Sequence, residues 1–237
     1  MKSVANDRPV VISLGGSMLF GGDGEIDIAY VKGFCSMVSR LKRGGAKLVV
    51  VVGGGKTAAK YANAARELVA SEFFADRLAI DATRLNAKLV IAALGEDAFP
   101  KVIKDIDDTF HAFREGLVPV GAGLLEGMTT DAVAALLAER LGAGHLVNVS
   151  NVDAIYDSDP KKNPGAKRLA QMTHAQLLAL AERDDSRKAR TNFVFDVVAT
   201  KIAARSNIPL HFVSGRDLAE VERAIAGGKH AGTVVSG

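Results

Sequence analysis

Two clusters of glycine in this chain have the composition of phosphate-binding loops. GGS at residues 15–17 directly follows an apolar run at 10–14, and GGG at 53–55 directly follows another at 47–52. Glycine lets the backbone turn sharply and leaves its N–H groups open to an anion, because no Cβ shields them. The second cluster also precedes a helical stretch, whose amino-terminal end attracts phosphate. The pair indicates a phosphate site, although a tight turn would use the same residues in the first cluster.

The second cluster completes neither of two common nucleotide-binding motifs. A P-loop, GxxxxGK[ST], would need glycine where the chain has Val50. The pattern GxGxxA, which begins at Gly53, also occurs in dinucleotide-binding domains. There the acidic residue that follows should end a second strand, whereas Glu67 and Glu72 lie in or beside helical sequence. A dehydrogenase is therefore the weaker alternative.

Two further segments place polar side chains where they can meet a nucleotide. Thr129, Thr130 and Asp131 precede an Ala/Leu-rich helical stretch. Threonine and aspartate cap the free N–H groups of a first helical turn, and one cap is enough. A second threonine can therefore hydrogen-bond a nucleobase or a phosphate.

The other segment follows the apolar run at 145–149. It contains Ser150, Asn151 and Asp153, and then Tyr156 and Asp159. One interpretation is a turn-rich surface loop. The alternative is a nucleotide-binding loop, with Tyr156 beside the base and Asp153 near Mg²⁺ or the transferring phosphoryl group.

The sequence has few features that would support a metal site, a disulfide, nucleic-acid binding or a membrane span. The histidines lie far apart with no HxxxH or HExxH spacing, and Cys35 is the only cysteine, so we expect no metal cage and no disulfide. The net charge is +3 with Lys and Arg scattered, which suits a nucleotide and does not imply nucleic acid. No apolar run approaches the roughly 20 residues of a membrane span, so we expect a cytoplasmic location and no membrane partner.

These loops must be positioned by the strands and helices around them. Apolar, β-branched runs predict strands at residues 10–14, 47–52, 117–120, 145–149, 210–213 and 233–235. Apolar residues at helical spacing predict helices at 28–42, 57–69, 74–94, 130–141, 173–182, 195–205 and 218–226. The alternation, with strands apolar on both faces, predicts an α/β three-layer sandwich, in which a mostly parallel sheet has helices on both faces. We expect one domain over residues 1–237.

Taken in order, the motifs resemble the amino acid kinase family, most closely its uridylate kinases of archaeal type. The matching stretches lie between Val11 and Val235 and read VISLGGSML, VVVGGGKTAAKYANAAR, TRLNAKLVIAALG, MTTDAVAALLAERL, VSNVDAIYDSDPKKNP and KHAGTVV. The resemblance implies an acceptor-binding lobe at about 1–143 and an ATP-binding lobe at about 144–237. It also implies a homohexamer.

The resemblance further implies a role for individual residues. Those it assigns to ATP are Gly16, Ser17, Gly55, Lys60, Ser150, Asn151, Tyr156 and Asp159. Those it assigns to the acceptor are Gly54, Asp76, Leu124, Gly127, Thr129 and Thr130. Asp153 and Asp196 match carboxylates near the phosphoryl-transfer centre. The implied reaction is transfer of the ATP γ-phosphoryl group to UMP, with Mg²⁺ bridging phosphates.

Three positions depart from the family pattern. Many members have lysine where this chain has Ser13, and an arginine common after GGGK is replaced by Ala59, beside Lys60. The acceptor loop, usually Thr-x-Pro-Gly, reads LLEGM at residues 124–128. Its apolar residues would favour an apolar phosphate or a carboxylate as acceptor. A kinase for such an acceptor, and a non-catalytic anion-binding or storage protein on the same fold, are therefore the alternatives.

Overall fold

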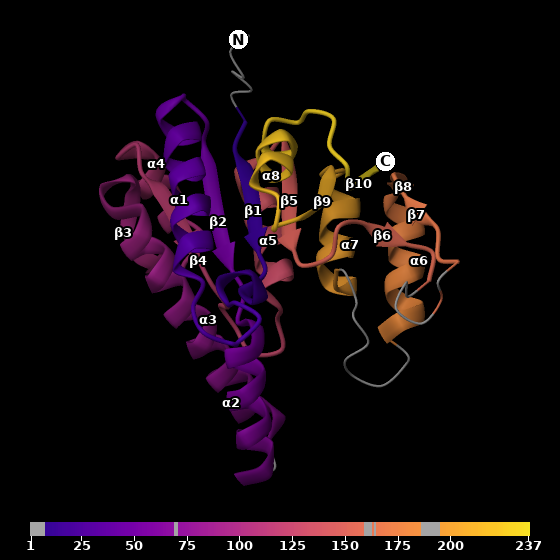
Figure 1. Cartoon of the computed structure of the whole chain (residues 1–237), viewed down its shortest axis with the longest axis horizontal. Helices are drawn as coiled ribbons and strands as arrows, with labels where there is room; N and C mark the ends of the chain where they lie inside the picture. The colour runs from indigo at the N-terminus through magenta and orange to yellow at the C-terminus, as the bar shows by residue number, and fades with distance from the viewer. Residues whose placement is uncertain (1–7, 69–70, 159–162, 164, 186–194) are drawn as a thin grey trace.

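The computed structural model of the chain describes residues 8–68, 71–158, 163, 165–185 and 195–237. Its centre is an eight-stranded sheet (Figure 1). From one edge to the other the strands are β3 (Ala98–Ile103), β4 (Val118–Gly121), β2 (Leu48–Val52), β1 (Val10–Leu14), β5 (His145–Ser150), β9 (Leu210–Ser214), β10 (Thr233–Ser236) and β8 (Gln171–Thr173). Neighbouring strands are parallel except β9 and β10. A separate two-stranded sheet consists of β6 (Ile155–Tyr156) and β7 (Arg168–Leu169).

The register of the three central strands brings their carboxyl ends to one level. Leu14, the last residue of β1, is opposite Val52 on one side and Val149 on the other. The segments that follow these strands therefore begin next to one another. In a parallel sheet this edge is where ligands bind.

Helices cover both faces of the sheet (Figure 1). One face carries α1 (Ile28–Arg43), α3 (Glu72–Leu94) and α8 (Leu218–Ile225). The other carries α4 (Asp108–Arg114), α5 (Thr130–Leu141), α6 (His174–Asp185) and α7 (Val197–Arg205). The remaining long helix, α2 (Gly55–Leu68), packs on α3 and projects with it beyond the carboxyl ends of the strands.

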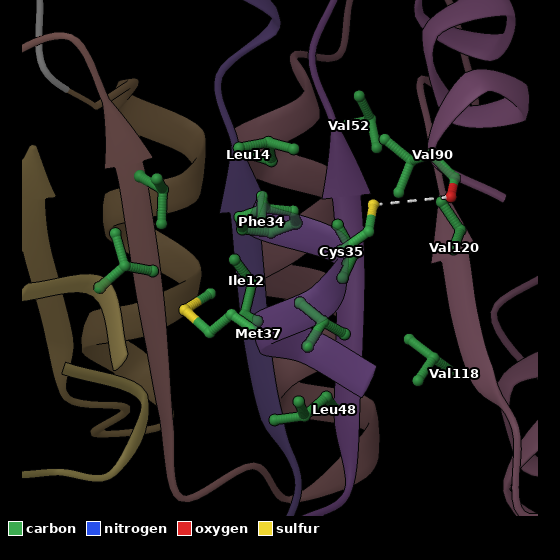
Figure 2. Packing of buried hydrophobic residues seen from close by; sticks show 14 of the residues in the cluster. Ile12, Leu14, Phe34, Cys35, Met37, Leu48, Val52, Val90, Val118 and Val120 are labelled. Atoms are coloured by element: carbon green, nitrogen blue, oxygen red, sulfur yellow. Dashed lines mark hydrogen bonds between the residues drawn. The ribbon is translucent and has the colours of Figure 1, made fainter. Parts of the chain in front are cut away.

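Alternate residues of the strands enter two separate cores. Ile12 and Leu14 of β1 pack with Phe34 of α1 (Figure 2). Val11 belongs to the core on the opposite side of the sheet. Cys35 lies in the first core, where its Sγ donates to the carbonyl oxygen of Val90 at 3.8 Å. Burial raises the pKa of this thiol to about 12, so it packs as a small apolar side chain.

The structure confirms the predicted α/β class and the mostly parallel, helix-covered sheet. Each predicted strand and helix is present, and every end lies within three residues of the predicted one. Four strands, β3, β6, β7 and β8, and the helix α4 were missed. β3 was missed because it is an edge strand that contains Pro100 and exposed residues, so it lacks the apolar run of a central strand. Among the described residues, no helix is long and apolar enough to cross a membrane.

Candidate active site

The two glycine loops contact each other through their backbones. Gly16 begins a short 3₁₀ helix, η1 (Gly16–Leu19), and a Cβ built on it would overlap Gly53 O and Gly55 N. Gly55 begins α2 with φ +58°, and a Cβ there would lie 2.7 Å from Gly16 O. Such approaches leave no room for a side chain on either glycine. The two predicted phosphate loops therefore form one continuous main-chain surface.

Side chains hold the second glycine loop from both sides. Asn86 of α3 donates from Nδ2 to Gly53 O at 2.9 Å and to Gly54 O at 3.2 Å. Thr130, the first residue of α5, has its Oγ1 3.5 Å from the place a Cβ on Gly53 would occupy. The loop thus lies between α3 and the amino-terminal end of α5. Gly54 of the loop and Thr130 of α5, both predicted to bind the phosphate acceptor, are therefore near each other.

Asp131 lies at the centre of a buried polar cluster that sequence reasoning missed. Ser13 Oγ donates to Asp131 Oδ1 at 2.7 Å, and Asn148 Nδ2 donates to the same oxygen at 3.0 Å. Burial raises the pKa of Asp131 to about 7, with a further rise from the charge of Asp196, while these two hydrogen bonds oppose the rise. Asp131 thus joins α5 to β1 and β5. The sequence offered only its place at a helix start.

Thr129 and Asp196 tie together the amino-terminal ends of two helices. Thr129 caps α5, where its Oγ1 accepts from Ala132 N at 3.1 Å, and Asp196 caps α7, where its Oδ1 accepts from Ala199 N at 2.8 Å. The Thr129 hydroxyl also donates to Asp196 Oδ2. One predicted acceptor residue and one predicted catalytic residue are therefore in direct contact.

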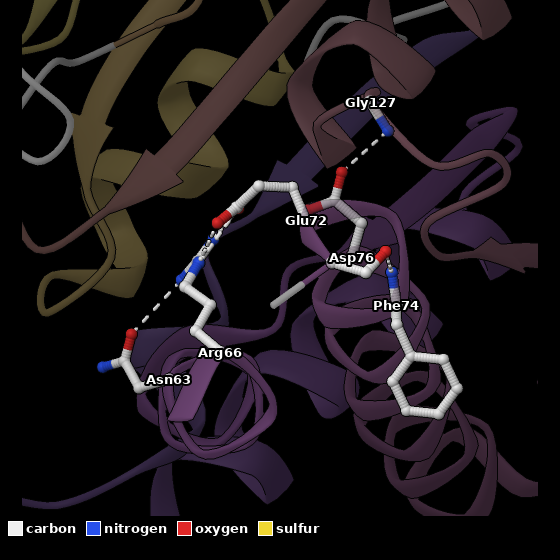
Figure 3. A network of polar contacts seen from close by, with 7 residues as sticks. Asn63, Arg66, Glu72, Phe74, Asp76 and Gly127 are labelled. Carbon is white, nitrogen blue, oxygen red and sulfur yellow. Dashed lines mark hydrogen bonds and ion pairs between the residues drawn. The ribbon is translucent and has the colours of Figure 1, made fainter. Parts of the chain in front are cut away.

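Asp76 and Gly127, both assigned to the acceptor, are also in contact. The Gly127 N–H donates to Asp76 Oδ2 at 2.9 Å (Figure 3). Beside them, Arg66 of α2 holds Glu72 of α3 through a bidentate ion pair. The carboxylate of Asp76 thereby fixes the loop between β4 and α5 against α3.

The apolar residues of that loop face two directions. Leu124 and Met128 are partly buried against the core on the α5 side of the sheet, whereas Leu125 is 60 % exposed. The carbonyl oxygen of Leu124 accepts from Arg84 Nη2 at 3.5 Å. Leu124 and Met128 therefore stabilise the loop itself, which removes the reason for expecting an apolar acceptor.

The end of β5 and the segment that follows it carry Ser150, Asn151 and Tyr156, which are assigned to ATP, and the predicted catalytic residue Asp153. Ser150 Oγ accepts from Val152 N at 3.2 Å, and the Tyr156 hydroxyl donates to the Asp153 carboxylate at 3.2 and 3.3 Å. Burial, and then the charge of Asp153, raises the pKa of Tyr156. No hydrogen bond between described residues joins the two predicted catalytic carboxylates, Asp153 and Asp196.

The other residues assigned to ATP are less tightly held. Ser17 is half-buried on η1, while Lys60 on α2 and Asn151 after β5 are exposed. Asp159 lies outside the described residues. Within the described part of the chain, no group of three or more His, Cys, Asp or Glu side chains could hold a metal ion. None of the individual ATP and acceptor assignments is tested by these positions, and they stay predictions.

Three histidines that are distant in sequence lie in contact away from this site, with their ring planes tilted by 48° and 47° in the two pairs. His145 and His211 are buried with ring centroids 4.7 Å apart, and His211 Nδ1 lies 2.8 Å from His230 Nε2. The Gly232 N–H donates to His230 Nδ1 at 3.0 Å, so the neutral His230 ring carries its proton on Nε2 and donates to His211. The spacing rules used on the sequence cannot find such a contact, since it is made between separate strands and a loop.

Comparison with known proteins gives matches over nearly the whole chain. The family model described as "Amino acid kinase family" matches residues 8–214. The uridylate kinase of Methanospirillum hungatei is 42 % identical over 227 residues, which are 96 % of this chain and 94 % of the relative. That of Thermococcus kodakarensis is 43 % identical over 226 residues, which are 95 % of this chain and 98 % of the relative. The solved structure of uridylate kinase from Archaeoglobus fulgidus is 37 % identical with a TM-score of 0.84, and the match covers 96 % of this chain and 100 % of that one.

Proposed function

This chain belongs to the amino acid kinase family, and on that premise we propose that it transfers the γ-phosphoryl group of ATP to UMP, giving ADP and UDP. The resemblance drawn from the sequence is thus confirmed at the level of the family. Relatives that share 42 and 43 % of their residues over nearly their full length are named uridylate kinases, which supports the acceptor. The cytoplasmic location expected from the sequence stays a prediction.

The contact between Gly16 and the loop of Gly53 and Gly55 is the main structural observation that supports this proposal. Because the two loops meet backbone to backbone, phosphates bound to one are next to phosphates bound to the other. Phosphoryl transfer depends mainly on such positioning and on stabilising charge on the transferring group. The acceptor oxygen of UMP is already anionic at neutral pH, so no strong general base is required.

The source of positive charge follows from what surrounds the glycine loops. Ser13 stands where many family members have lysine, and its hydroxyl is bound to Asp131. The helix ends at Gly55 of α2 and Thr130 of α5 therefore supply the fixed positive field at this site.

The carboxylates at this site fit Mg²⁺ bound with ATP. Protein usually gives this ion one or two carboxylates while phosphates and water complete its shell. The charge of Asp196 adds to the rise in the pKa of Asp131, so two carboxyl groups lie near each other here. Asp196 would hold the ion, which neutralises charge on the phosphates when bound. Thr129 keeps the Asp196 carboxylate in place.

Steady-state ADP production with a panel of acceptors tests the proposal. UMP should support turnover far above CMP and AMP, and above isopentenyl phosphate and an acylated amino acid. Preference for one of the last two would instead identify another branch of the family. No turnover with any acceptor, together with retained binding of phosphate, would make the chain an anion-binding protein.

Assembly as a homohexamer is part of the same proposal. Large apolar side chains are exposed on α2 and α3, where Tyr61 is 57 %, Phe73 59 % and Leu85 63 % exposed. Contact between copies would cover them. Light scattering on the purified chain should give six times the chain mass of 24.9 kDa, and a monomer would reject this part of the proposal.

A further inference from the structure

The hydroxyl group of Thr233, at the start of β10, lies between the two strands of the small β6–β7 sheet. The Ile155 N–H donates to Thr233 Oγ1 at 2.9 Å, and this hydroxyl donates to Leu169 O at 2.6 Å. Thr233 and Ile155 are fully buried, each with 0 % exposure. Water therefore cannot take the place of the hydroxyl, which is the one group bridging these two backbone atoms.

The bridge lies at one end of the β6–β7 ladder. Ile155 is opposite Leu169, and the Asp157 N–H donates to Lys167 O at 3.0 Å two residues further along. In an antiparallel ladder every second pair exchanges hydrogen bonds, so the pair after Asp157 and Lys167 is Ile155 and Leu169. At this pair Thr233 Oγ1 binds a backbone atom of each strand. A side chain of the large sheet thus sets the position of the small one.

The small sheet carries Tyr156, which is assigned to ATP, and it follows Asp153, which is assigned to the phosphoryl-transfer centre. Tyr156 is the neighbour of Ile155 in β6, and its hydroxyl donates to Asp153 at 3.2 Å. We propose that Thr233 is a positioning residue for ATP, which acts through Ile155 on Tyr156 and Asp153. This inference rests on the proposed function of the chain. It adds a residue that lies 77 positions from Tyr156 in sequence and touches no substrate.

Substitution of Thr233 can test the role of its hydroxyl group while the rest of β10 is unchanged. Thr233→Val keeps the shape of the side chain and removes the bridge, while Val234 N still donates to Ala170 O at 3.0 Å. We expect KM for ATP to rise on the order of 10-fold, because two buried backbone groups lose their partner and the loop shifts to satisfy them. KM for UMP should not change. Thr233→Ser keeps the hydroxyl and should restore KM for ATP.

Thr109→Val is the matched control. Thr109 is also a fully buried threonine whose hydroxyl donates to a backbone oxygen, that of Ile106, but it lies in α4. Both KM values should stay at the wild-type level in this variant. An unchanged KM for ATP in Thr233→Val, or an equal rise of both KM values, would overturn the inference.

Hydrogen exchange in the wild-type chain gives a reading that needs no variant. ATP should slow hydrogen exchange of the Ile155 and Tyr156 amides, and UMP should not. If ATP has no effect on these two amides, the inference is overturned, even in the case that Thr233→Val does not fold. Calorimetric binding of ATP separates this idea from the proposed reaction. If the wild type binds ATP but does not phosphorylate UMP, the proposed function fails, while weaker ATP binding by Thr233→Val would still support the positioning role.

Discussion

Ser13 Oγ donates to Asp131 Oδ1 at 2.7 Å, a contact between residues 118 positions apart that joins the central strand β1 to the start of α5. Asn148 Nδ2 reaches the same oxygen from β5. The cluster places a carboxyl group of raised pKa next in sequence to Thr130, whose Oγ1 lies 3.5 Å from the place a Cβ on Gly53 would occupy. Its protonation state therefore affects both stability and the site.

Asp131→Asn should make the protein more stable at pH 8. The pKa of Asp131 is raised to about 7 in the folded chain, above its ordinary value of 3.8. The folded state then binds the proton more tightly than the unfolded state, so stability is lost as pH rises through the window from about 4 to 7. The asparagine avoids a buried charge and should gain on the order of 2 kcal/mol at pH 8. Urea unfolding in EDTA from pH 4.5 to 8 measures this gain.

Asp153→Asn is the control for that experiment, because Asp153 is an exposed carboxylate. It should leave the pH profile of unfolding as in the wild type. If Asp131→Asn has the same profile as well, the charge of Asp131 does not cost stability.

The three contacting histidines, His145, His211 and His230, should give the opposite pH dependence. Burial, and then the charges of His145 and His230, lower the pKa of His211 to about 3. The unfolded chain therefore takes up the proton first, and stability is lost as pH falls below about 6.5, by up to roughly 1.4 kcal/mol per pH unit. His211→Phe should flatten the slope between pH 6.5 and 5, and the exposed His111→Gln should not. Equal slopes in all three proteins would contradict this prediction.

Gly16→Ala should abolish turnover and lower stability by roughly 1–3 kcal/mol, since its Cβ would lie 2.6 Å from the carbonyl carbon of Gly53. Backbone atoms on both sides cannot move aside without opening the site. Gly22→Ala adds the same methyl group where nothing lies within 4 Å and should behave as wild type. Thermal unfolding and ADP production measure both effects. An active, stable Gly16→Ala protein would show that the loops separate readily.

Asp196→Asn should lower kcat roughly 100-fold while α7 stays folded. Asparagine caps a helix as well as aspartate does, so its amide oxygen keeps Ala199 N as a partner, while the charge and the acceptor for the Thr129 hydroxyl are lost. Circular dichroism checks the fold, and a titration of activity with Mg²⁺ checks whether the loss is in metal binding. Unchanged kcat would remove Asp196 from the phosphoryl-transfer centre.

Asp76→Asn should raise KM for UMP about 10-fold and leave KM for ATP unchanged. The amide oxygen still accepts the Gly127 N–H, so the loop stays in place while the carboxylate charge that the family resemblance assigns to the acceptor site is lost. Initial-rate kinetics with each substrate varied in turn separate the two constants. Equal changes in both would mean that Asp76 acts only on the fold.

The parts of the site that depend on short segments were predictable from the sequence. Apolar runs identified β1, β2 and β5, and each glycine loop directly follows a strand as the sequence indicated. That these loops bind phosphate stays a prediction. The contact between Gly16 and Gly53 was not predictable, because it depends on the register of β1 against β2. Local rules describe one strand and the turn that follows it, and not the distance between two turns.

Asp131 shows that local sequence rules also fail to predict contacts between distant side chains. Its position after two threonines is typical of a helix cap, yet Thr129 is the residue that caps α5. Asp131 instead turns towards Ser13 and Asn148, which belong to different strands. The raised pKa that makes this residue notable arises from burial, which the local pattern does not contain.

The main-chain contact between the glycine loops also affects how readily resistance to an inhibitor could arise by mutation. A compound that hydrogen-bonds only to side chains is defeated by replacing them. A compound anchored on the peptide groups of Gly16, Gly53 and Gly55 meets a surface with no side chain to replace, and any Cβ added there collides with the backbone opposite. Resistance by point mutation at these positions would carry loss of the enzyme's own activity with it.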